Sequence, residues 1–207
     1  MTTQGDDDAR LVADWKAGNQ ESGAELFRRY YGSVLRFYQS KVGPAGSDLV
    51  QRCFLRCLEV HHNIRDDGNF RCFVFGVARN VLLEHYRRAK SDARMDFTAQ
   101  TVEDLSPTPT SELAHGEQSQ LLLLALRRLP VEQQIVVELY YWEDLNAREI
   151  AEIYEVPEPT IRTRLRRAKL KLEQELEVLA RAPKDGPAAK ANLEVWAREL
   201  RDQLGRS

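Results

Sequence analysis

Apolar residues return every three or four positions along most of this 207-residue chain, whereas runs that alternate apolar and polar residues are nearly absent. The first spacing gives an α-helix one apolar face, and a half-buried β-strand needs the second. The sequence therefore predicts an all-α protein. The expected helices span residues 9–17, 21–42, 47–61, 70–90, 117–129, 131–142, 147–154, 159–180 and 188–204.

The helical spacing fails between about residues 93 and 116, where the chain contains Pro-Thr-Pro and carries four acids against one arginine. Proline and an excess of one charge favour an extended linker over a packed helix. We therefore expect two small helical domains, at residues 9–92 and 117–180, joined by an extended acidic linker at 93–116. Residues 181–207 form a C-terminal extension of unknown role, which ends in a short helix.

Composition excludes several classes of protein. The longest apolar run in a predicted helix, Leu121–Leu126, is far too short to cross a bilayer. The first residues, MTTQGDDDAR, are acidic and polar and lack the apolar stretch of a signal peptide. Three cysteines cannot all pair with one another, and an odd count argues against a disulfide scaffold. The expected protein is cytoplasmic and does not insert into a membrane.

One helix gathers positive charge, although the whole chain has a net charge of −2. Between Pro159 and Leu172 there are six basic side chains and no acid. The preceding short helix and tight turn complete a helix-turn-helix pattern, whose second helix enters the major groove of DNA. A solvated helix face would mix both signs of charge at i, i+4, so DNA contact is the favoured interpretation. The expected DNA-binding residues are Thr160, Arg162, Thr163, Arg164, Arg166, Arg167, Lys169 and Lys171.

The predicted helix at residues 47–61 has two distinct sides. Its wide apolar face is formed by Leu49, Val50, Cys53, Phe54, Cys57 and Leu58. The opposite side carries Asp48, Gln51, Arg52, Leu55 and Arg56. A single exposed leucine such as Leu55 is ordinary in a soluble protein, but a surface that docks onto another protein also presents such a residue.

Three stretches resemble a known family. They are SDLVQRCFLRCLE and FRCFVFGVARNVLLEHYRR in the first predicted domain and LRRLPVEQQIVVELYYWEDLNAREIAEIYEVPEPTIRTRLRRAKLKL in the second. In this order, across an acidic linker, they resemble bacterial RNA polymerase sigma factors of the extracytoplasmic-function type, group IV of the sigma-70 family. The resemblance covers residues 9–180. It implies that the first domain is sigma region 2, which melts the promoter, and that the second is sigma region 4.

The resemblance also implies partners and contact residues. A sigma factor binds core RNA polymerase, recognises the −35 and −10 promoter elements, and initiates transcription of a specific regulon. The residues implied to bind polymerase are Asp48, Gln51, Arg52, Leu55 and Arg56. Those implied to bind the melted, single-stranded −10 element are Arg65, Asn69, Arg79, Asn80, Arg87 and Arg88. The basic helix is implied to bind the double-stranded −35 element.

Family members are often held inactive by an anti-sigma factor, and the resemblance leaves open whether this chain has one. No catalytic residue, metal site or cofactor is predicted, and the protein is not expected to be an enzyme. The sequence contains no glycine-rich phosphate loop and no nucleophile with a partner base. A sigma factor needs neither, because polymerase performs the chemistry.

The chain departs from the family pattern at several positions. Glu155 and Pro159 stand where the family usually has glycine in the turn and before the recognition helix. Proline is tolerated in the first turn of a helix, whereas Glu155 is expected to need a left-handed conformation that glutamate disfavours. Cys53, Cys57 and Leu58 replace an aliphatic residue, a small residue and a tryptophan. Residues 181–207 have no counterpart in the minimal family pattern.

Two other interpretations remain open. The chain could be a stand-alone helix-turn-helix regulator that dimerises and binds a palindrome without polymerase. It could also be a metal or thiol sensor, since Cys53, Cys57 and His61 share a helical face that Cys72 could approach. Buried cysteine more commonly acts as a small hydrophobic residue, which favours the sigma-factor interpretation over the sensor.

The C-terminal helix at residues 188–204 carries an apolar stripe of Leu193, Trp196, Leu200 and Leu204. An isolated helix of this length is marginal in water, so the stripe implies a surface to pack on. That surface is either the second domain or a partner protein. The short linker favours the second domain, because it keeps the effective concentration high.

Overall fold

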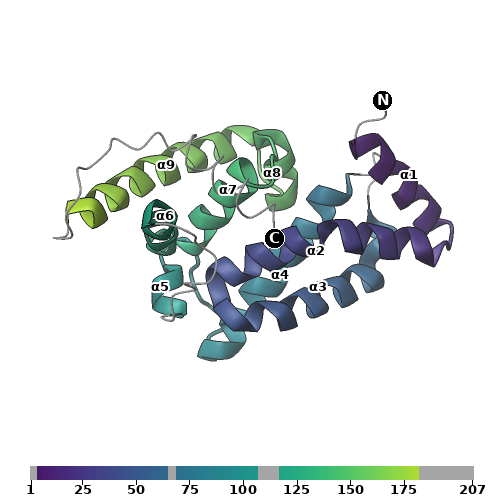
Figure 1. Ribbon diagram of the computed structural model, residues 1–207, viewed down its shortest axis with the longest axis horizontal. Coiled ribbons are helices and arrows are strands. Elements are labelled where there is room, and N and C mark those ends of the chain that lie inside the picture. The colour runs from purple at the N-terminus through teal and green to yellow at the C-terminus, as the bar shows by residue number, and fades with distance from the viewer. Residues whose placement is uncertain (1–3, 65–68, 107–116, 182–207) are drawn as a thin grey trace.

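The structure, a computed structural model, describes residues 4–64, 69–106 and 117–181 (Figure 1). In these ranges the chain forms helices joined by turns, with short 3-10 segments at Gly43–Ala45 and His61–Asn63. The α-helices are α1 (Gln4–Lys16), α2 (Gln20–Val42), α3 (Gly46–Val60), α4 (Phe70–Lys90), α5 (Val102–Leu105), α6 (Glu117–Arg127), α7 (Val131–Tyr141), α8 (Ala147–Tyr154) and α9 (Glu158–Arg181).

The prediction of an all-α protein is confirmed. Among the described residues, backbone pairing of the β type is limited to one isolated bridge between Thr101 and Pro130. None of the helices in the described ranges is long and apolar enough to cross a membrane. The predicted helix at residues 188–204, with its apolar stripe, lies outside the described residues, as does Arg65.

Helices α1–α4 form an N-terminal domain, in which α3 buries most of its predicted apolar face. Leu49, Val50, Cys53 and Cys57 are buried there. The prediction is wrong for Leu58, whose exposed fraction is 42%. At 100° per residue, Leu58 lies about 180° around the helix from Leu49, so the helices that cover Leu49 cannot reach it.

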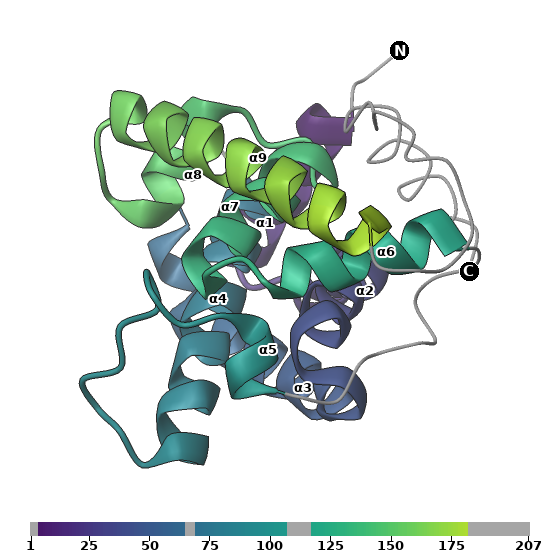
Figure 2. The same ribbon diagram turned by 90° about the vertical axis from the view of Figure 1, so that its left-hand side faces the viewer.

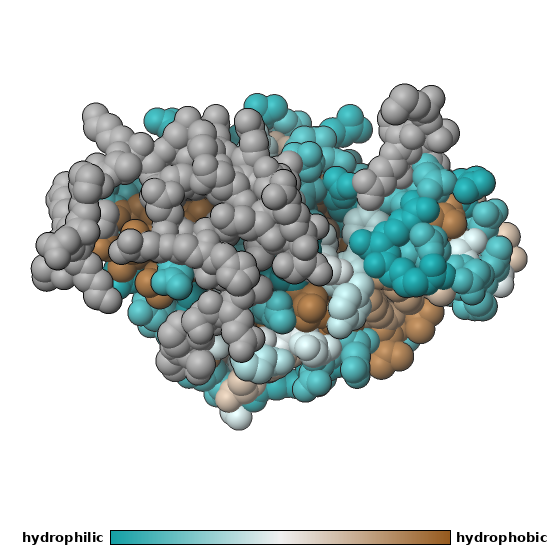
Figure 3. All heavy atoms as spheres, viewed as in Figure 1, coloured by the Kyte–Doolittle hydropathy of each residue, from teal (hydrophilic) through white to brown (hydrophobic). Residues whose placement is uncertain are grey.

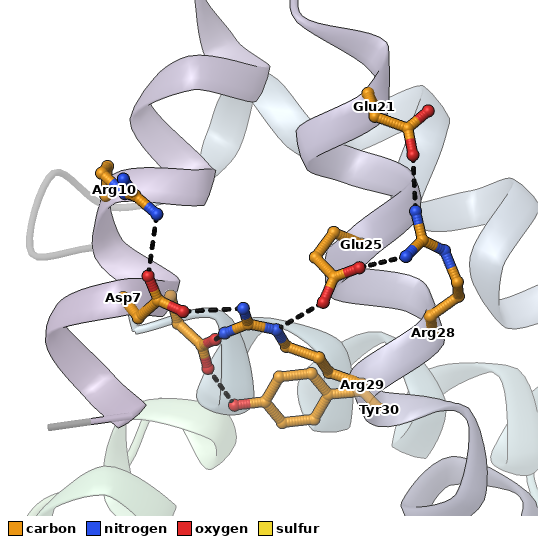
Figure 4. A network of polar contacts seen from close by, with 8 residues as sticks. Asp7, Arg10, Glu21, Glu25, Arg28, Arg29 and Tyr30 are labelled. Carbon is orange, nitrogen blue, oxygen red and sulfur yellow. Dashed lines mark hydrogen bonds and ion pairs between the residues drawn. The ribbon is translucent and has the colours of Figure 1, made fainter.

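A network of ion pairs around Arg29 fastens α1 to α2 (Figure 4). The Arg29 guanidinium donates to Asp7, Asp8 and Glu25 over N–O distances of 2.7, 3.0 and 3.0 Å. The Tyr30 hydroxyl donates to Asp8 at 2.5 Å. Hydrogen bonding to Arg29 lowers the pKa of Asp7 below its ordinary value. The acidic start of the chain is therefore part of the folded domain and not a free tail.

Helices α6–α9 form a C-terminal domain, with α7 at its centre. Leu122, Leu126 and Leu129 on one side, and Ala168 and Leu172 of α9 on the other, close a small apolar cluster around Val137. The apolar stripe of the basic helix is largely buried: Ile161, Ala168 and Leu172 are each inaccessible to solvent.

The two domains pack directly against each other (Figures 1 and 2). Helix α8 lies along α4, and α6 touches α2. A single connected apolar core joins residues of α2, α3 and α4 to residues of α7 and α8. The described parts of the chain therefore form one closed body, which the sequence did not predict.

The expectation of an extended linker does not hold for residues 93–106. Met95, Phe97 and Val102 are buried, and the Phe97 ring lies 6.2 Å from the ring of Tyr86 in α4. On the other side, the Phe97 carbonyl accepts the backbone N–H of Glu132 at 3.2 Å. These apolar side chains lie where both domains contribute a surface, and the local sequence pattern carries no information about such a surface. Residues 107–116 lie outside the described residues.

Candidate nucleic-acid interface

Helices α8 and α9 form the predicted helix-turn-helix unit. Asn146 begins α8 through a capping box with Glu149, which satisfies the first backbone N–H groups of the helix. Glu155 ends α8 in a left-handed conformation, with φ 52° and ψ 42°, so the expectation for this residue is confirmed. Its backbone N–H bonds back to α8, and the chain turns directly into α9.

Replacing Glu155 by glycine is expected to raise the free energy of unfolding by about 1 kcal/mol. Glycine avoids the clash of Cβ with the carbonyl in this conformation and is the preferred residue at a helix C-terminus. The Glu155 side chain is exposed, so little contact is lost. Chemical denaturation checks the change. Glu155→Ala is the matched control, because it removes the same side chain but keeps Cβ and should give no such gain.

The basic residues of α9 fall into two groups. Arg162, Thr163, Arg166 and Arg167 are exposed, whereas Thr160, Arg164, Lys169 and Lys171 are half-buried. Arg162 pairs with Glu158 at 2.6 Å, and the Thr163 hydroxyl donates to the Pro159 carbonyl at 2.9 Å. The guanidinium of Arg164 lies 5.3 Å from the centre of the Tyr154 ring. Arg164 therefore turns toward α8.

One further cation of this unit was missed by sequence reasoning. Arg148, in the first turn of α8, has a side chain that is 81% exposed and lies 3.7 Å from Glu152. In helix-turn-helix proteins the first helix crosses the DNA backbone. The position of Arg148 within the motif could have identified it, since a cation on that helix can contact phosphate.

The residues implied to read single-stranded DNA lie on α4, and they differ in accessibility. Asn80, Arg87 and Arg88 are exposed. Asn69 caps α4 by accepting the N–H of Cys72 at 3.1 Å, and its own amide donates to Glu149 at 3.0 Å. Asn69 thus serves as the cap of α4, and its amide is engaged by the other domain.

Among the cations of this set that the structure describes, Arg79 is the most enclosed. It forms an ion pair with Glu132, and its guanidinium lies 4.3 Å from the centre of the Tyr154 ring. Burial lowers the pKa of Arg79, but the hydrogen bonds and charge of Glu132 together with the interaction with Tyr154 hold the pKa above its ordinary value. Arg79 is therefore fully charged and occupied by the C-terminal domain.

The residues implied to bind polymerase line one side of α3. Asp48, Gln51, Leu55 and Arg56 are exposed, and half-buried Arg52 lies 3.6 Å from Glu84 of α4. Leu55 is 60% exposed, and the neighbouring Leu58 adds apolar surface that the sequence had assigned to the core. Figure 3 shows the hydrophobic surface that gathers over the C-terminal half of α3.

A groove of about 1070 Å³ is lined both by residues implied to bind polymerase and by residues implied to bind single-stranded DNA. It runs between α3 and α4 and ends against the last turn of α8. Its lining includes Arg52, Leu55 and Arg56 from the first set and Asn69, Asn80, Arg87 and Arg88 from the second. Glu152, Ile153 and Glu155 close its end.

The cysteines form no site of their own among the described residues. Cys53 and Cys57 are buried in the domain core, and Cys72 is half-buried. A hydrogen bond with the neighbouring Cys53 thiol, and then burial, raise the pKa of Cys57. His61 stacks on Trp15 at 4.6 Å and is committed to the packing of α1. The residues that the structure describes contain no group of three or more metal-ligating side chains.

Known proteins match the chain in both halves. The family Sigma-70 region 2 matches residues 26–91, and the family Sigma-70, region 4 matches residues 119–172. The ECF RNA polymerase sigma factor SigW of Bacillus subtilis is 23% identical over 82% of this chain and 97% of its own length. The ECF RNA polymerase sigma factor SigM of Mycobacterium tuberculosis is 27% identical over 83% of this chain and 86% of its own.

A solved structure shares the fold. The sigma factor RpoE from Bartonella quintana, in complex with the anti-sigma factor NepR, aligns with a TM-score of 0.57 and 19% identity. The alignment covers 75% of this chain and 96% of that one. Sigma-70 region 2 is thus matched in the N-terminal half and region 4 in the C-terminal half. The chain therefore belongs to the sigma-70 family, as a sigma factor of the extracytoplasmic-function type.

Proposed function

We propose that this protein binds core RNA polymerase, recognises the −35 and −10 elements of a promoter, and initiates transcription of a specific regulon. The observation that carries the proposal is the recognition helix α9. It is held by buried Ile161, Ala168 and Leu172 while Arg162, Arg166 and Arg167 face outward. The protein acts in the cytoplasm, where polymerase and promoter DNA are, and without a catalytic site of its own.

The −35 element is bound by α9 in the major groove. Arg166 and Arg167 are exposed in its first half, where a recognition helix meets base edges. An arginine there can donate two hydrogen bonds to a guanine. Thr160, Arg164, Lys169 and Lys171 flank these arginines and contact phosphate. Arg148 extends the same positive surface onto α8.

The −10 element is bound in the groove beside α4. The exposed amide of Asn80 offers both a donor and an acceptor to an unpaired base. Arg87 and Arg88 both lie about two turns further along the same helix and provide the positive track that a single strand follows. Asn69, Arg79 and Arg65 complete the set. The same groove touches the polymerase-binding side of α3, so docking and strand capture occur side by side.

An anti-sigma factor is a further proposed partner. The structurally similar RpoE was solved in complex with one, NepR. The fold is shared, although an identity of 19% does not carry over the contact residues. Co-purification of this protein from its own cells would identify such a partner.

Replacing Arg166 by alanine is expected to weaken promoter binding by the holoenzyme by about 1–3 kcal/mol, if it makes a bidentate contact to a base. The measurement is a titration of holoenzyme onto a promoter selected with this protein and core polymerase. Gln174→Ala is the matched control, because Gln174 is an exposed, uncharged residue of the same helix.

Equal affinity of the Arg166→Ala and Gln174→Ala proteins would contradict the assignment of α9. The same promoter fragment also separates the rival function. A stand-alone regulator would shift the fragment without polymerase, whereas a sigma factor should do so only as holoenzyme.

A further inference from the structure

We infer that residues 188–204 pack as a helix along the outer face of α9, over Leu170 and Val178, and so complete the C-terminal domain. The occupant of this face is thus a segment of the same chain. The inference goes beyond the proposed function and does not depend on it, since neither Leu170 nor Val178 belongs to the sets implied to bind DNA or polymerase.

The second half of α9 presents two large apolar side chains to solvent. Leu170 is 51% exposed, and Val178 is 58% exposed. At 100° per residue, both lie at least about 120° around the helix from buried Leu172, and they are about two turns apart along one side. A single exposed apolar residue is ordinary, but a pair on one side of a helix forms a surface that a second helix can cover.

This part of α9 extends past the family pattern. The match to Sigma-70, region 4 ends at residue 172, whereas α9 continues to residue 181. The added turns are held from the inner side, because Leu176 is buried in the cluster with Leu122 and Leu126 of α6. In Figure 1 this end of α9 points away from α1–α4. In the described ranges, therefore, the outer side of these turns is exposed.

The chain that follows α9 carries an apolar stripe of matching length. Its predicted helix places Leu193 and Leu200 on one face, with Trp196 between them. At 1.5 Å per residue, Leu193 and Leu200 lie about 10 Å apart along the helix axis, and Leu170 and Val178 about 12 Å. A helix of this length is marginal in water without a surface to pack on, and the exposed side of α9 provides that surface.

The connection between the two helices favours an antiparallel pair. Residues 182–187, APKDGP, contain two prolines and a glycine, which are typical of a turn. Six residues can span about 20 Å, whereas packed helices lie only about 8–10 Å apart. A short connection also keeps the effective concentration on the order of millimolar. Counted back from this turn, Leu193 lies against Val178 and Leu200 against Leu170.

The packed tail borders the basic surface of α9 and does not cover it. Arg162 and Arg166 lie about 80–120° around the helix from the line that joins Leu170 and Val178. Arg167 lies on that line, about one turn before Leu170, and is exposed. The tail helix therefore sets the limit of the surface that α9 can offer to DNA, at the level of Arg167.

Pairs of cysteines test the docking in the full chain. Val178→Cys with Leu193→Cys, in a Cys72→Ser background, joins two positions that the docked tail brings into contact. The remaining native thiols, Cys53 and Cys57, are buried. Val178→Cys with Val195→Cys is the matched control, because residue 195 is only two positions further along but lies about 160° around the predicted helix from residue 193.

Under mild oxidation, the first pair is expected to form its intramolecular disulfide about tenfold faster than the control pair, because only a docked helix gives the two positions different effective concentrations. The rates are followed by gel mobility without reductant. Equal rates in the two proteins would mean that the tail presents all its sides to α9, and would overturn the inference.

A second variant removes the surface itself. Leu170→Asp with Val178→Asp is expected to raise the rate of trypsin cleavage after Arg198 about tenfold, because an undocked tail is open to the protease. Leu124→Asp is the control, since Leu124 is 41% exposed on the same domain and lies about 160° around α6 from buried Leu122.

Equal cleavage rates in these two variants, or a parent protein cleaved as fast as the double variant, would contradict the docking and leave the tail to a partner protein. Circular dichroism checks that both variants remain folded. Neither experiment uses polymerase or DNA, so failure of the proposed function would not alter its outcome.

Discussion

Replacing Leu55 and Arg56 together by aspartate is expected to abolish binding to core RNA polymerase, with an affinity loss of about a hundredfold or more, while the fold survives. Leu55 is the most exposed large apolar side chain among the described residues, at 60%. An apolar anchor beside an arginine is typical of the few residues that dominate an interface. Two carboxylates at its centre would have to be buried without partners.

The fold should survive because neither side chain supports it. Arg56 pairs with Glu59 at 2.7 Å, and both side chains are 61% exposed, so this ion pair contributes little to stability. Binding is measured by titrating labelled protein with core polymerase, and helicity by circular dichroism. Leu124→Asp is the control, since Leu124 is exposed on the C-terminal domain. Unchanged binding of the double variant, or equal loss in the control, would show that α3 is not the docking helix.

Replacing Glu138 by alanine is expected to lower the free energy of unfolding by about 3–5 kcal/mol, the typical cost of leaving a buried charge without its partner. Burial already lowers the pKa of Lys41 in spite of the attraction of Glu138. Without Glu138, Lys41 retains the Phe37 carbonyl at 2.7 Å and the Ser40 hydroxyl at 3.1 Å, but it loses the carboxylate with which it forms an ion pair.

The stability of the Glu138→Ala protein is measured by chemical denaturation, followed by tryptophan fluorescence and by circular dichroism. The double variant Lys41→Met with Glu138→Leu is the control. It removes both charges and fills the same space, so it should recover most of the loss. A single variant as stable as the parent protein would show that Lys41 is not buried by the C-terminal domain in solution.

The features that the sequence predicted correctly are mostly local ones. Helix spacing and the left-handed turn at Glu155 depend on residues within a few positions of one another, and both are present. The family resemblance rested on two such local blocks, and both were matched by sigma-70 regions. The proposal that the basic helix reads the promoter rests on the same kind of information, since six cations without an acid favour a polyanionic partner.

The tertiary structure alone decided what those local elements touch. Leu58 is exposed because the covering helices do not reach its side of α3. Residues 93–106 are packed because Met95, Phe97 and Val102 find a surface that both domains build. Arg79 pairs with an acid that is more than fifty positions away, at Glu132. Helical periodicity indicates which face of a helix is apolar or charged, but it does not indicate which other residues contact that face. That partner depends on long-range contacts, which exist only once the two domains have come together.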